Sequence, residues 1–529
     1  MGSEQAMLPG WASAQERYGP TDGAASSEKE EGERARKARF QQIDREQLFW
    51  RMVNVERLIA DDHPARAIWE FVGKLDLSSY TGEIRAVEGM AGRPALHPQL
   101  MISLWVYAYS QGVGSARAIE QLCEWDPAYQ WLTGTAVVNA HSLSDFRVEN
   151  EEAVKGLFVQ ILALLSADGL ITLERVMQDG TKIRASAASD SFRKKERIEQ
   201  AMKEAREQVE AVNETAEEES SRRRAKARQR AQRERQERLG SALEEFEKLK
   251  AEGSVKDKKK TRVSTTDPQA RVMKQPEGGF APSYNVQINT DAANAVIVAV
   301  DVTQAGNDFE QLTPGVDRVE QNLGETPDQV VVDGGYVSRD NIVEMKSRGV
   351  EFIGPQCDEE GKGKGSYEGR GVSPEYHSSQ FVYDAATDSF HCPQGKTLYY
   401  EGKEERNSQV SYKYRAAMAD CQACAAKGQC CPGNQVTGRS IQRTEGLPEV
   451  ADFRHKMQTE EARKIYRQRA QVAETPNLWI KAKFKLRQFN VRGLRKVGME
   501  ALWACLTYNI RQWIRLRWRT EGAVATATA

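Results

Sequence analysis

The spacing of apolar residues divides the chain into helical and mixed parts. Between residues 49 and 169 they recur at helical spacing, as at Leu100, Leu104 and Ala108. Two glycines, at positions 112 and 114, end that run before a second helix. Residues 41–169 are therefore predicted to form an all-α domain. A helix, a glycine turn and a second helix are compatible with a DNA-reading module and equally with an ordinary helical bundle.

From residue 170 onward the pattern changes to short apolar runs that are typical of buried strands. Two of these runs end at Asp179 and at Asp333, and each acid is followed by glycine. Between them, residues 284–302 alternate, turn and then become β-branched, which predicts a hairpin. Helical spacing at 309–323 and 341–347 and a short strand at 350–354 follow. This order predicts an α/β fold, with residues 170–190 as the first core strand and residues 263–355 as the rest of the core.

Two insertions interrupt this core. Residues 191–262 are acidic first and arginine-rich afterwards, with few apolar side chains, so they predict a long solvated helix or a helical hairpin. The arginine run is either a solvent-exposed face or a surface that grips the DNA backbone. Residues 356–445 form a Cys-rich insertion, and residues 446–518 form C-terminal helices that complete the core. Residues 1–40 are predicted to be a disordered arm, and residues 519–529 a tail.

Composition narrows the class of protein. A chain of 529 residues is long enough for several domains. Its net charge of −1 means that nucleic-acid binding must be argued from where the charges lie. No stretch has the length and apolarity of a membrane span, and the N-terminus lacks the order of a signal peptide. These features predict a protein of the reducing cytoplasm.

The cysteines are spaced like metal ligands. Cys421 and Cys424 form a Cys-x2-Cys pair, Cys392 precedes it, and Cys430 and Cys431 follow closely. Cys392, Cys421, Cys424 and either Cys430 or Cys431 would make a closed structural Zn²⁺ site, and we favour Cys430 as the fourth ligand. The alternative is a cluster of free thiols without a metal.

Three carboxylates have the setting that metal-dependent phosphoryl transfer requires. Asp179 and Asp333 end apolar strands beside glycine, where a side chain points into open space and can bind a hard cation. Glu474 lies in a helical stretch farther along the chain. Two strand-end aspartates and one helical glutamate can hold two Mg²⁺ ions about 3.5–4 Å apart. The sequence therefore predicts a nucleotidyl-transfer enzyme.

At these residues the chain resembles the DDE transposases of bacterial insertion sequences. The resemblance runs from about Phe49 to Trp513 and rests on Asp179-Gly180-Thr181-Lys182-Ile183, Thr266-Asp267-Pro268, Tyr284-Asn285-Val286-Gln287, Asp333-Gly334-Gly335-Tyr336 and the set Tyr466, Arg469, Glu474 and Lys481. That group usually places three residues between the arginine and the glutamate, whereas this chain has four. Pro476 is compatible with this arrangement if the active helix starts near it.

The resemblance implies a fold and an activity. The fold would be a ribonuclease-H-like mixed sheet with an all-α N-terminal domain, a charged helical insertion and a Cys-rich insertion. The activity would be Mg²⁺- or Mn²⁺-dependent cleavage and strand transfer at insertion-sequence ends, with Asp179, Asp333 and Glu474 as catalytic, metal-binding residues. Tyr466, Arg469 and Lys481 would contact DNA, although a helical salt-bridge face would explain them equally simply.

The implied partners are the element's terminal repeats and target DNA, bound by a homodimer close to the bacterial nucleoid, without a membrane. Two other readings remain open at this point: a hydrolytic metallonuclease that does not rejoin strands, and a DNA-binding protein derived from a transposase without activity. If Glu474 is the third acid, it should lie close to both aspartates. Its rivals are Glu460, Glu461 and Glu500.

Overall fold

The computed structural model describes residues 52–82, 94–215, 222–251, 261–355, 369–406, 409–433, 437–444 and 448–519. The predicted N-terminal arm and nearly all of the predicted tail lie outside these residues. Within them, no helix is long and apolar enough to cross a membrane.

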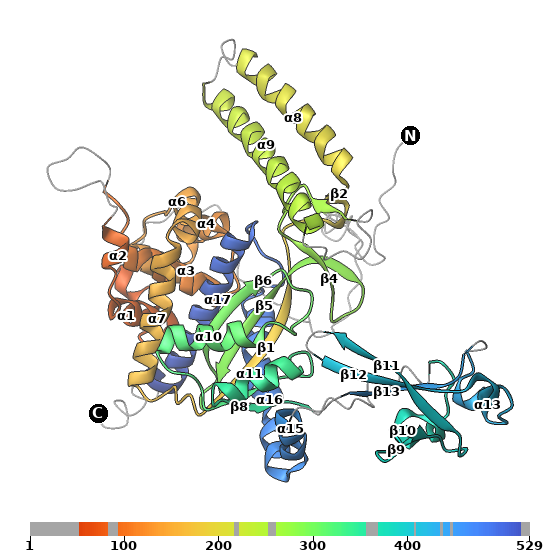
Figure 1. Cartoon of the computed structure of the whole chain (residues 1–529). Helices are drawn as coiled ribbons and strands as arrows, with labels where there is room; N and C mark the ends of the chain where they lie inside the picture. The colour runs from red at the N-terminus through yellow and green to blue at the C-terminus, as the bar shows by residue number, and fades with distance from the viewer. Residues whose placement is uncertain are drawn as a thin grey trace, which may run out of the picture. The chain divides into compact units, whose positions relative to one another are not determined.

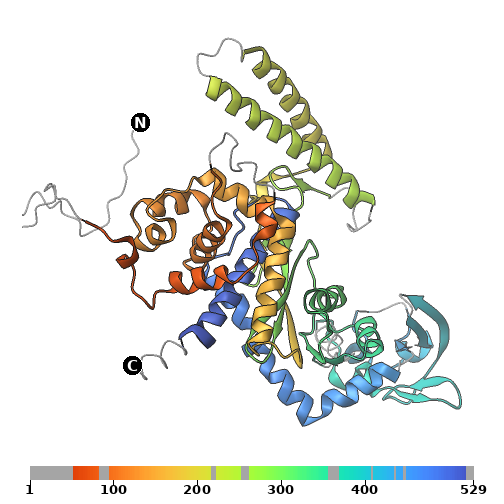
Figure 2. The ribbon, with the colours of Figure 1, turned by 90° about the vertical axis from the view of Figure 1, so that its left-hand side faces the viewer.

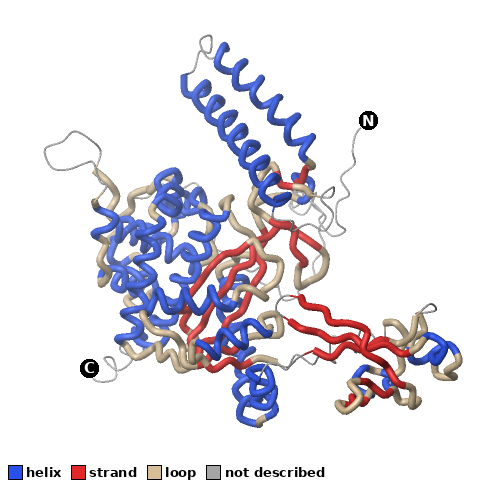
Figure 3. The backbone as a smooth tube through the Cα atoms, viewed as in Figure 1, coloured by secondary structure: helices blue, strands red, loops and turns tan. Residues whose placement is uncertain are grey.

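A mixed sheet forms the centre of the fold (Figures 1 and 3). Its strands are β1 (Arg175–Arg184), β4 (Arg271–Lys274), β5 (Phe280–Asp291), β6 (Val296–Thr303), β7 (Gln329–Val331) and β8 (Glu351–Ile353). The strand order is β4-β5-β1-β7-β8, and β6 also pairs with β5. Strands β1, β7 and β8 are parallel, whereas β5 runs antiparallel to β1 and to β6. The predicted α/β, ribonuclease-H-like core and its hairpin are confirmed.

Side chains along β5 alternate between an apolar face and a polar face of the sheet. Tyr284, Val286 and Ile288 are buried in the larger hydrophobic core. Asn285 and Gln287 lie between them, are also buried, and point to the opposite face because successive strand residues alternate. One face of β5 is therefore apolar packing, and the other is a buried polar surface.

Helices cover both sides of this sheet. The N-terminal domain consists of α1 (Pro64–Gly73), α2 (Ser78–Thr81), α3 (Pro98–Ser110), α4 (Ala116–Trp125), α5 (Pro127–Thr133), α6 (Ala140–Glu149) and α7 (Glu151–Ala167). The last long helix, α17 (Leu494–Trp513), contacts α3, α6, α7 and β6, so it joins this domain to the sheet (Figure 2). Helix α3 is buried on nearly every side, which identifies it as a core helix of the bundle.

A second core lies around the parallel strands. It combines side chains of β7, β8, α10 (Leu312–Leu323), α11 (Arg339–Ser347), α15 (Pro448–Gln458) and α16 (Glu460–Leu478). Helix α16 begins at Glu460, where the Thr459 side chain accepts a hydrogen bond from Ala462 N–H. The expectation that a helix starts near Pro476 is wrong. Proline lies instead in the last turn, and the chain then widens into a π-helix over Trp479–Lys483.

The charged insertion is the hairpin rather than a single helix. Helices α8 (Lys195–Thr215) and α9 (Arg222–Ala251) pack against each other around a small core that includes Ile198, Leu239 and Phe246. A two-stranded sheet of β2 (Phe192–Arg193) and β3 (Val263–Ser264) closes its base. The hairpin's own apolar seam explains how so charged a segment can be ordered.

The Cys-rich segment forms an antiparallel sheet of its own, in the order β13-β12-β11-β10-β9. Its elements are β9 (Val382–Asp384), β10 (Ser389–His391), β11 (Thr397–Arg406), β12 (Gln409–Ala416), β13 (Ser440–Thr444) and the short helices α13 (Met418–Gln422) and α14 (Lys427–Cys430). Phe381, Leu398, Tyr414 and Ile441 form its apolar centre. Because Tyr414 lies on β12 and Ile441 on β13, this small core joins the two ends of the loop between these strands, which carries Cys421, Cys424, Cys430 and Cys431.

Candidate active site

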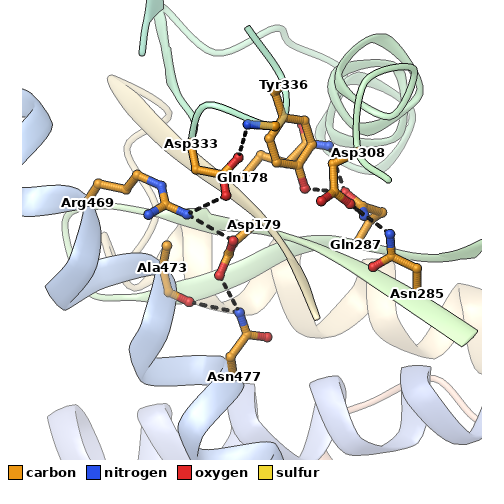
Figure 4. Close-up of polar contacts among 11 residues, drawn as sticks. Gln178, Asp179, Asn285, Gln287, Asp308, Asp333, Tyr336, Arg469, Ala473 and Asn477 are labelled. Atoms are coloured by element: carbon orange, nitrogen blue, oxygen red, sulfur yellow. Dashed lines mark hydrogen bonds and ion pairs between the residues drawn. The ribbon is translucent and has the colours of Figure 1, made fainter. Parts of the chain in front are cut away.

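Asp179 and Asp333 meet where the parallel pairing of β1 with β7 ends. The prediction that Asp179 ends its strand is wrong, because β1 continues to Arg184 along β5 and Asp179 lies in its middle. The register pairs Val176 with Val330 and Met177 with Val331, so the two acids follow at the same height. Arg469 Nη2 lies 2.9 Å from Asp179 Oδ1 and 3.7 Å from Asp333 Oδ2 (Figure 4). Two carboxylates that are 154 positions apart in the sequence thus share one positive charge.

Helix α16 supplies this positive charge from a face that packs against β1. Arg469, Ala473 and Asn477 are each four residues apart and therefore lie on one side of the helix. Asn477 Nδ2 donates to Asp179 Oδ2 at 2.8 Å, so both oxygens of Asp179 have a partner on the helix. The small, buried Ala473 lets the helix approach the strand closely.

Glu474 lies beside, and not on, the face of α16 that carries Arg469, Ala473 and Asn477. It is one residue beyond Ala473, and each helical residue rotates by about 100°. Its side chain is exposed and, among the described residues, makes no hydrogen bond or ion pair. The additional residue between Arg469 and Glu474 is the cause, because Ala473 takes the position in which an acid four residues after the arginine would lie.

None of the rival acids takes this place. Glu460 pairs with Arg467 on the surface, Glu461 is exposed, and Glu500 is fully buried against Arg147 at 3.5 Å. Throughout the described part of the chain, no three His, Cys, Asp or Glu side chains form a group arranged to hold a metal ion. The structure therefore brings two of the three predicted acids together and leaves Glu474 outside the pair.

Tyr466 and Lys481 differ in their surroundings. Tyr466 is partly buried and packs against the core around β7 and β8. Lys481 is half-buried in the π-helical turn, where burial lowers its pKa and the Glu277 and Asp179 carboxylates oppose that shift. Lys481 therefore lies within electrostatic reach of the aspartate pair, whereas Tyr466 stabilises the helix that carries Arg469.

Burial strongly perturbs the first aspartate. It raises the pKa of Asp179 to about 6, against the lowering effect of Arg469, and the nearby Asp333 charge adds to the rise. A carboxylate in this setting is costly to ionise unless a cation compensates it. Oxygen donors of this kind suit Mg²⁺ or Mn²⁺. The guanidinium lies where such a cation would neutralise both acids, and the buried Asn477 Oδ1 beside Asp179 has no hydrogen-bond partner in the described structure.

Sequence reasoning missed a polar network on the other face of β1. Asp308 Oδ1 accepts hydrogen bonds from Asn285 Nδ2 and Gln287 Nε2, each at 2.7 Å. Gln287 Oε1 accepts from the hydroxyl of the buried Tyr336 at 2.5 Å. The alternation of Asn285 and Gln287 on a predicted strand was a signal for this surface. Asp308 lies in the loop between β6 and α10 and had no comparable signal in the sequence.

The cysteines gather around one small cavity. Cys392, Cys421, Cys424, Cys430 and Cys431 all line it, and its volume is about 30 Å³. As they lie in the described structure, no three of them form a group arranged to hold a metal ion. Backbone N–H groups of Lys396 and Arg439 donate to the sulfurs of Cys392 and Cys421 at 3.3 and 3.4 Å. Burial raises the pKa of the Cys430 thiol to about 12. The described cysteines form no disulfide.

A basic segment leads away from the aspartates. From the end of the π-helix to the first turn of α17, exposed cationic side chains include Lys483, Lys485, Arg487, Arg492, Arg495 and Lys496. The segment is anchored to the end of β1, because Arg184 N–H donates to Arg487 O and Phe489 N–H donates to Arg184 O. The strand that carries Asp179 therefore also holds a row of positive charges.

Two family models match the chain. One, described as a transposase DDE domain, matches residues 391–514, and the other, described as a transposase domain (DUF772), matches residues 53–149. Both matches are to transposase domains, and together they support an insertion-sequence DDE transposase. No curated protein and no solved structure matches it.

The matched segments carry different parts of this transposase. Residues 391–514 include the cysteine cluster, Arg469, Glu474 and Lys481, whereas Asp179 and Asp333 lie between the two matches. The matched segments contact each other through α6 and α17, where Trp503 Nε1 donates to Arg147 O at 3.2 Å. The family identifies a polynucleotidyl-transferase type of enzyme.

Proposed function

We propose that this transposase cleaves DNA at the ends of its insertion sequence and joins the freed 3′ ends to target DNA, with Asp179 and Asp333 at the centre of the reaction. The observation that carries this proposal is the sharing of Arg469 by Asp179 and Asp333. Two acids close enough for a single guanidinium to bridge them are suited to sharing divalent cations during catalysis.

In this mechanism Asp179 and Asp333 would hold Mg²⁺ or Mn²⁺. The bound ions would activate the attacking water or 3′-hydroxyl and stabilise the leaving oxygen. Asn477 keeps the Asp179 carboxylate oriented by donating to Oδ2. Arg469 lies next to both carboxylates, and its planar guanidinium donors suit the binding of a DNA phosphate there.

Glu474 remains the predicted third acid. It lies on the same helix as Asn477, which touches Asp179, and three residues before it. Glu474 would therefore reach the cations by a rotation at the end of α16, where the helix already changes to π geometry. Lys481, from that π-helical turn, would contact a phosphate near the cut.

DNA is the partner that the exposed basic segment fits. The segment is tied to β1 at Arg184, five residues beyond Asp179, so a strand cut at the aspartates would continue toward Lys485 and Arg487. Phosphate contacts of this kind are independent of base sequence and weaken with salt. Binding of terminal repeats by a homodimer near the nucleoid stays a prediction from the family.

We also propose that Cys392, Cys421, Cys424 and Cys430 bind a structural Zn²⁺ ion. These four residues line one cavity, and N–H donors to two of the sulfurs favour the thiolate form that zinc requires. The ion would hold β10 to the two short helices of the insertion. Free thiols without a metal are the competing outcome.

The experiment uses the full chain, a labelled element end and Mg²⁺, and it maps cut and joined products. Asp179→Ala and Asp333→Ala should each abolish cleavage and leave DNA binding nearly intact, because they remove ligands from the reacting centre. Glu474→Gln should do the same if it is the third acid. Asp452→Asn, which removes an exposed acid paired with Lys346, is the matched control.

The products separate the competing functions. Cutting without joining would identify a hydrolytic metallonuclease, and binding without cutting in the unaltered protein would identify an inactive DNA-binding descendant. Normal cleavage by Asp179→Ala would overturn the catalytic assignment.

A further inference from the structure

Glycine follows each of the paired aspartates, and the structure shows what fills the space that these glycines leave. A Cβ atom added to Gly180 would lie 2.5 Å from Asp308 Oδ1. A Cβ atom added to Gly335 would lie 2.9 Å from Asp333 Oδ1 and 3.6 Å from Asp308 Oδ2. The Asp308 carboxylate therefore occupies room that only glycine leaves at position 180, and it lies at ordinary contact distance from the Cβ position of Gly335.

Asp308 approaches β1 from the face opposite to Arg469. In the antiparallel ladder Gly180 pairs with Gln287 and Asp179 with Ile288, and paired residues point to the same face. Asp179 thus points toward α16, whereas Asp308 lies on the Gln287 face (Figure 4). Asp333, at the strand end, is next to both groups. Asp333 Oδ1 and Asp308 Oδ2 lie 2.9 and 3.6 Å from the same point, the position that a Cβ atom on Gly335 would take, so the two oxygens are near each other.

The two oxygens of Asp308 have different environments. Oδ1 accepts both amide hydrogen bonds, from Asn285 and from Gln287, which fixes the orientation of the carboxylate. Oδ2 accepts no hydrogen bond from the described residues and faces Gly335. A carboxylate held through one oxygen, with the other oriented toward a second acid, is prepared to bind a cation.

Another oxygen here has no partner. Asn285 is 1% exposed, and its Oδ1 accepts no hydrogen bond within the described structure, although its Nδ2 group donates to Asp308. A buried amide oxygen without a partner is costly, and a cation or a cation-bound water would satisfy it. The charge of Asp308 also acts on Asp179 and on the Tyr336 hydroxyl, which places it within the electrostatic field of the site.

We propose that Asp308 is a further metal-binding residue of the active site and that its free Oδ2 binds a divalent cation jointly with Asp333. This inference rests on the proposed function. Arg469 neutralises the aspartates from the α16 side, and Asp308 supplies negative charge from the opposite side of β1. Asp308 would hold one cation of the pair from this side, opposite to the helix that carries Glu474.

The test measures Mn²⁺ binding to the DNA-free full chain by calorimetry. Asp308→Asn keeps an oxygen that can accept both amide hydrogen bonds but replaces Oδ2 with a group that cannot bind a cation. It should weaken Mn²⁺ binding at least tenfold, whereas the control Asp452→Asn should leave it unchanged. Asp179→Asn is measured in parallel because it tests the proposed metal centre itself.

Unchanged Mn²⁺ affinity in Asp308→Asn, together with weakened affinity in Asp179→Asn, would overturn the role of Asp308 and leave the proposed function standing. Unchanged affinity in both variants would overturn the metal centre. If Asp308→Asn does not fold, Asp308→Glu and Asp308→Gln, which share size and differ in charge, decide the question. Tighter Mn²⁺ binding by the Glu variant supports the proposal, and equal binding by both refutes it.

Discussion

Replacement of Glu500 by glutamine should destabilise the junction between the two matched segments. Glu500 is fully buried and lies 3.5 Å from the equally buried Arg147. It accepts hydrogen bonds from Asn490 N and Nδ2 at 2.9 and 2.7 Å and from Val491 N at 3.3 Å. The variant leaves the Arg147 charge inside the protein without its carboxylate.

Breaking a buried ion pair by removing one partner costs about 3–5 kcal/mol. Arg147 keeps the Gly114 carbonyl at 2.7 Å and lies over the Trp105 ring at 4.6 Å, so part of its stabilisation survives. Glutamine also keeps one oxygen for the Asn490 donors. We therefore expect Glu500→Gln to lower the free energy of unfolding by ~3 kcal/mol, the lower end of that range.

Urea unfolding followed by tryptophan fluorescence suits this measurement, because Trp105 and Trp503 both contact Arg147. Glu460→Gln is the control, since its ion pair is exposed and should contribute less than about 1 kcal/mol. A Glu500→Gln variant as stable as the unaltered protein would refute the reasoning. Loss of Mg²⁺-dependent cleavage at unchanged stability would instead show that Glu500 is a catalytic acid.

Three further predictions concern other parts of the chain. Burial raises the pKa of Asp267 in the folded protein, so ionisation of this carboxyl destabilises the fold as pH rises above its unfolded pKa of 3.8. Asp267→Asn should therefore raise the Tm more at pH 7 than at pH 4, and an equal change in Tm at both pH values would contradict this. Freshly reduced protein should contain about one zinc ion per chain by elemental analysis, and the Cys421→Ser variant should contain none. Absence of zinc from the unaltered protein would contradict the proposed zinc site. Lys485→Gln should reduce the slope of log Kd for DNA against log salt by about 1 without changing base preference, and an unchanged slope would exclude Lys485 from the phosphate contacts.

Local sequence patterns determined the elements of the core. Apolar runs that end at an acid and glycine predicted the strands that lead to Asp179 and Asp333, and both strands are present. The end predicted for the first strand is wrong, because β1 continues through Asp179 to Arg184 along β5. The hairpin between residues 284 and 302 followed from alternation and turn residues. These features depend on neighbours within a few positions, which the sequence shows directly.

Other features depended on packing across the chain. Asp308 entered the site because the fold brings a loop against Gly180, and nothing near residue 308 signals this contact. Glu474 was predicted to lie beside the aspartates from a motif, whereas the phase of α16 directs Arg469 and Asn477 toward them. Helical phase is set by the whole helix and its partner, so a shift of one residue moved the acid by about 100°.

The sequence by itself determined which residue types the site can use and the strands on which two of them lie. The tertiary structure decided which of them meet. The parallel register of β1 and β7 placed two distant aspartates at one height, α16 supplied the cation that they share, and Gly180 beside Asp179 left room for a third carboxylate. Strands form through local pattern, but the convergence of charges needs register, helix phase and close backbone approach, and these exist only in the folded chain.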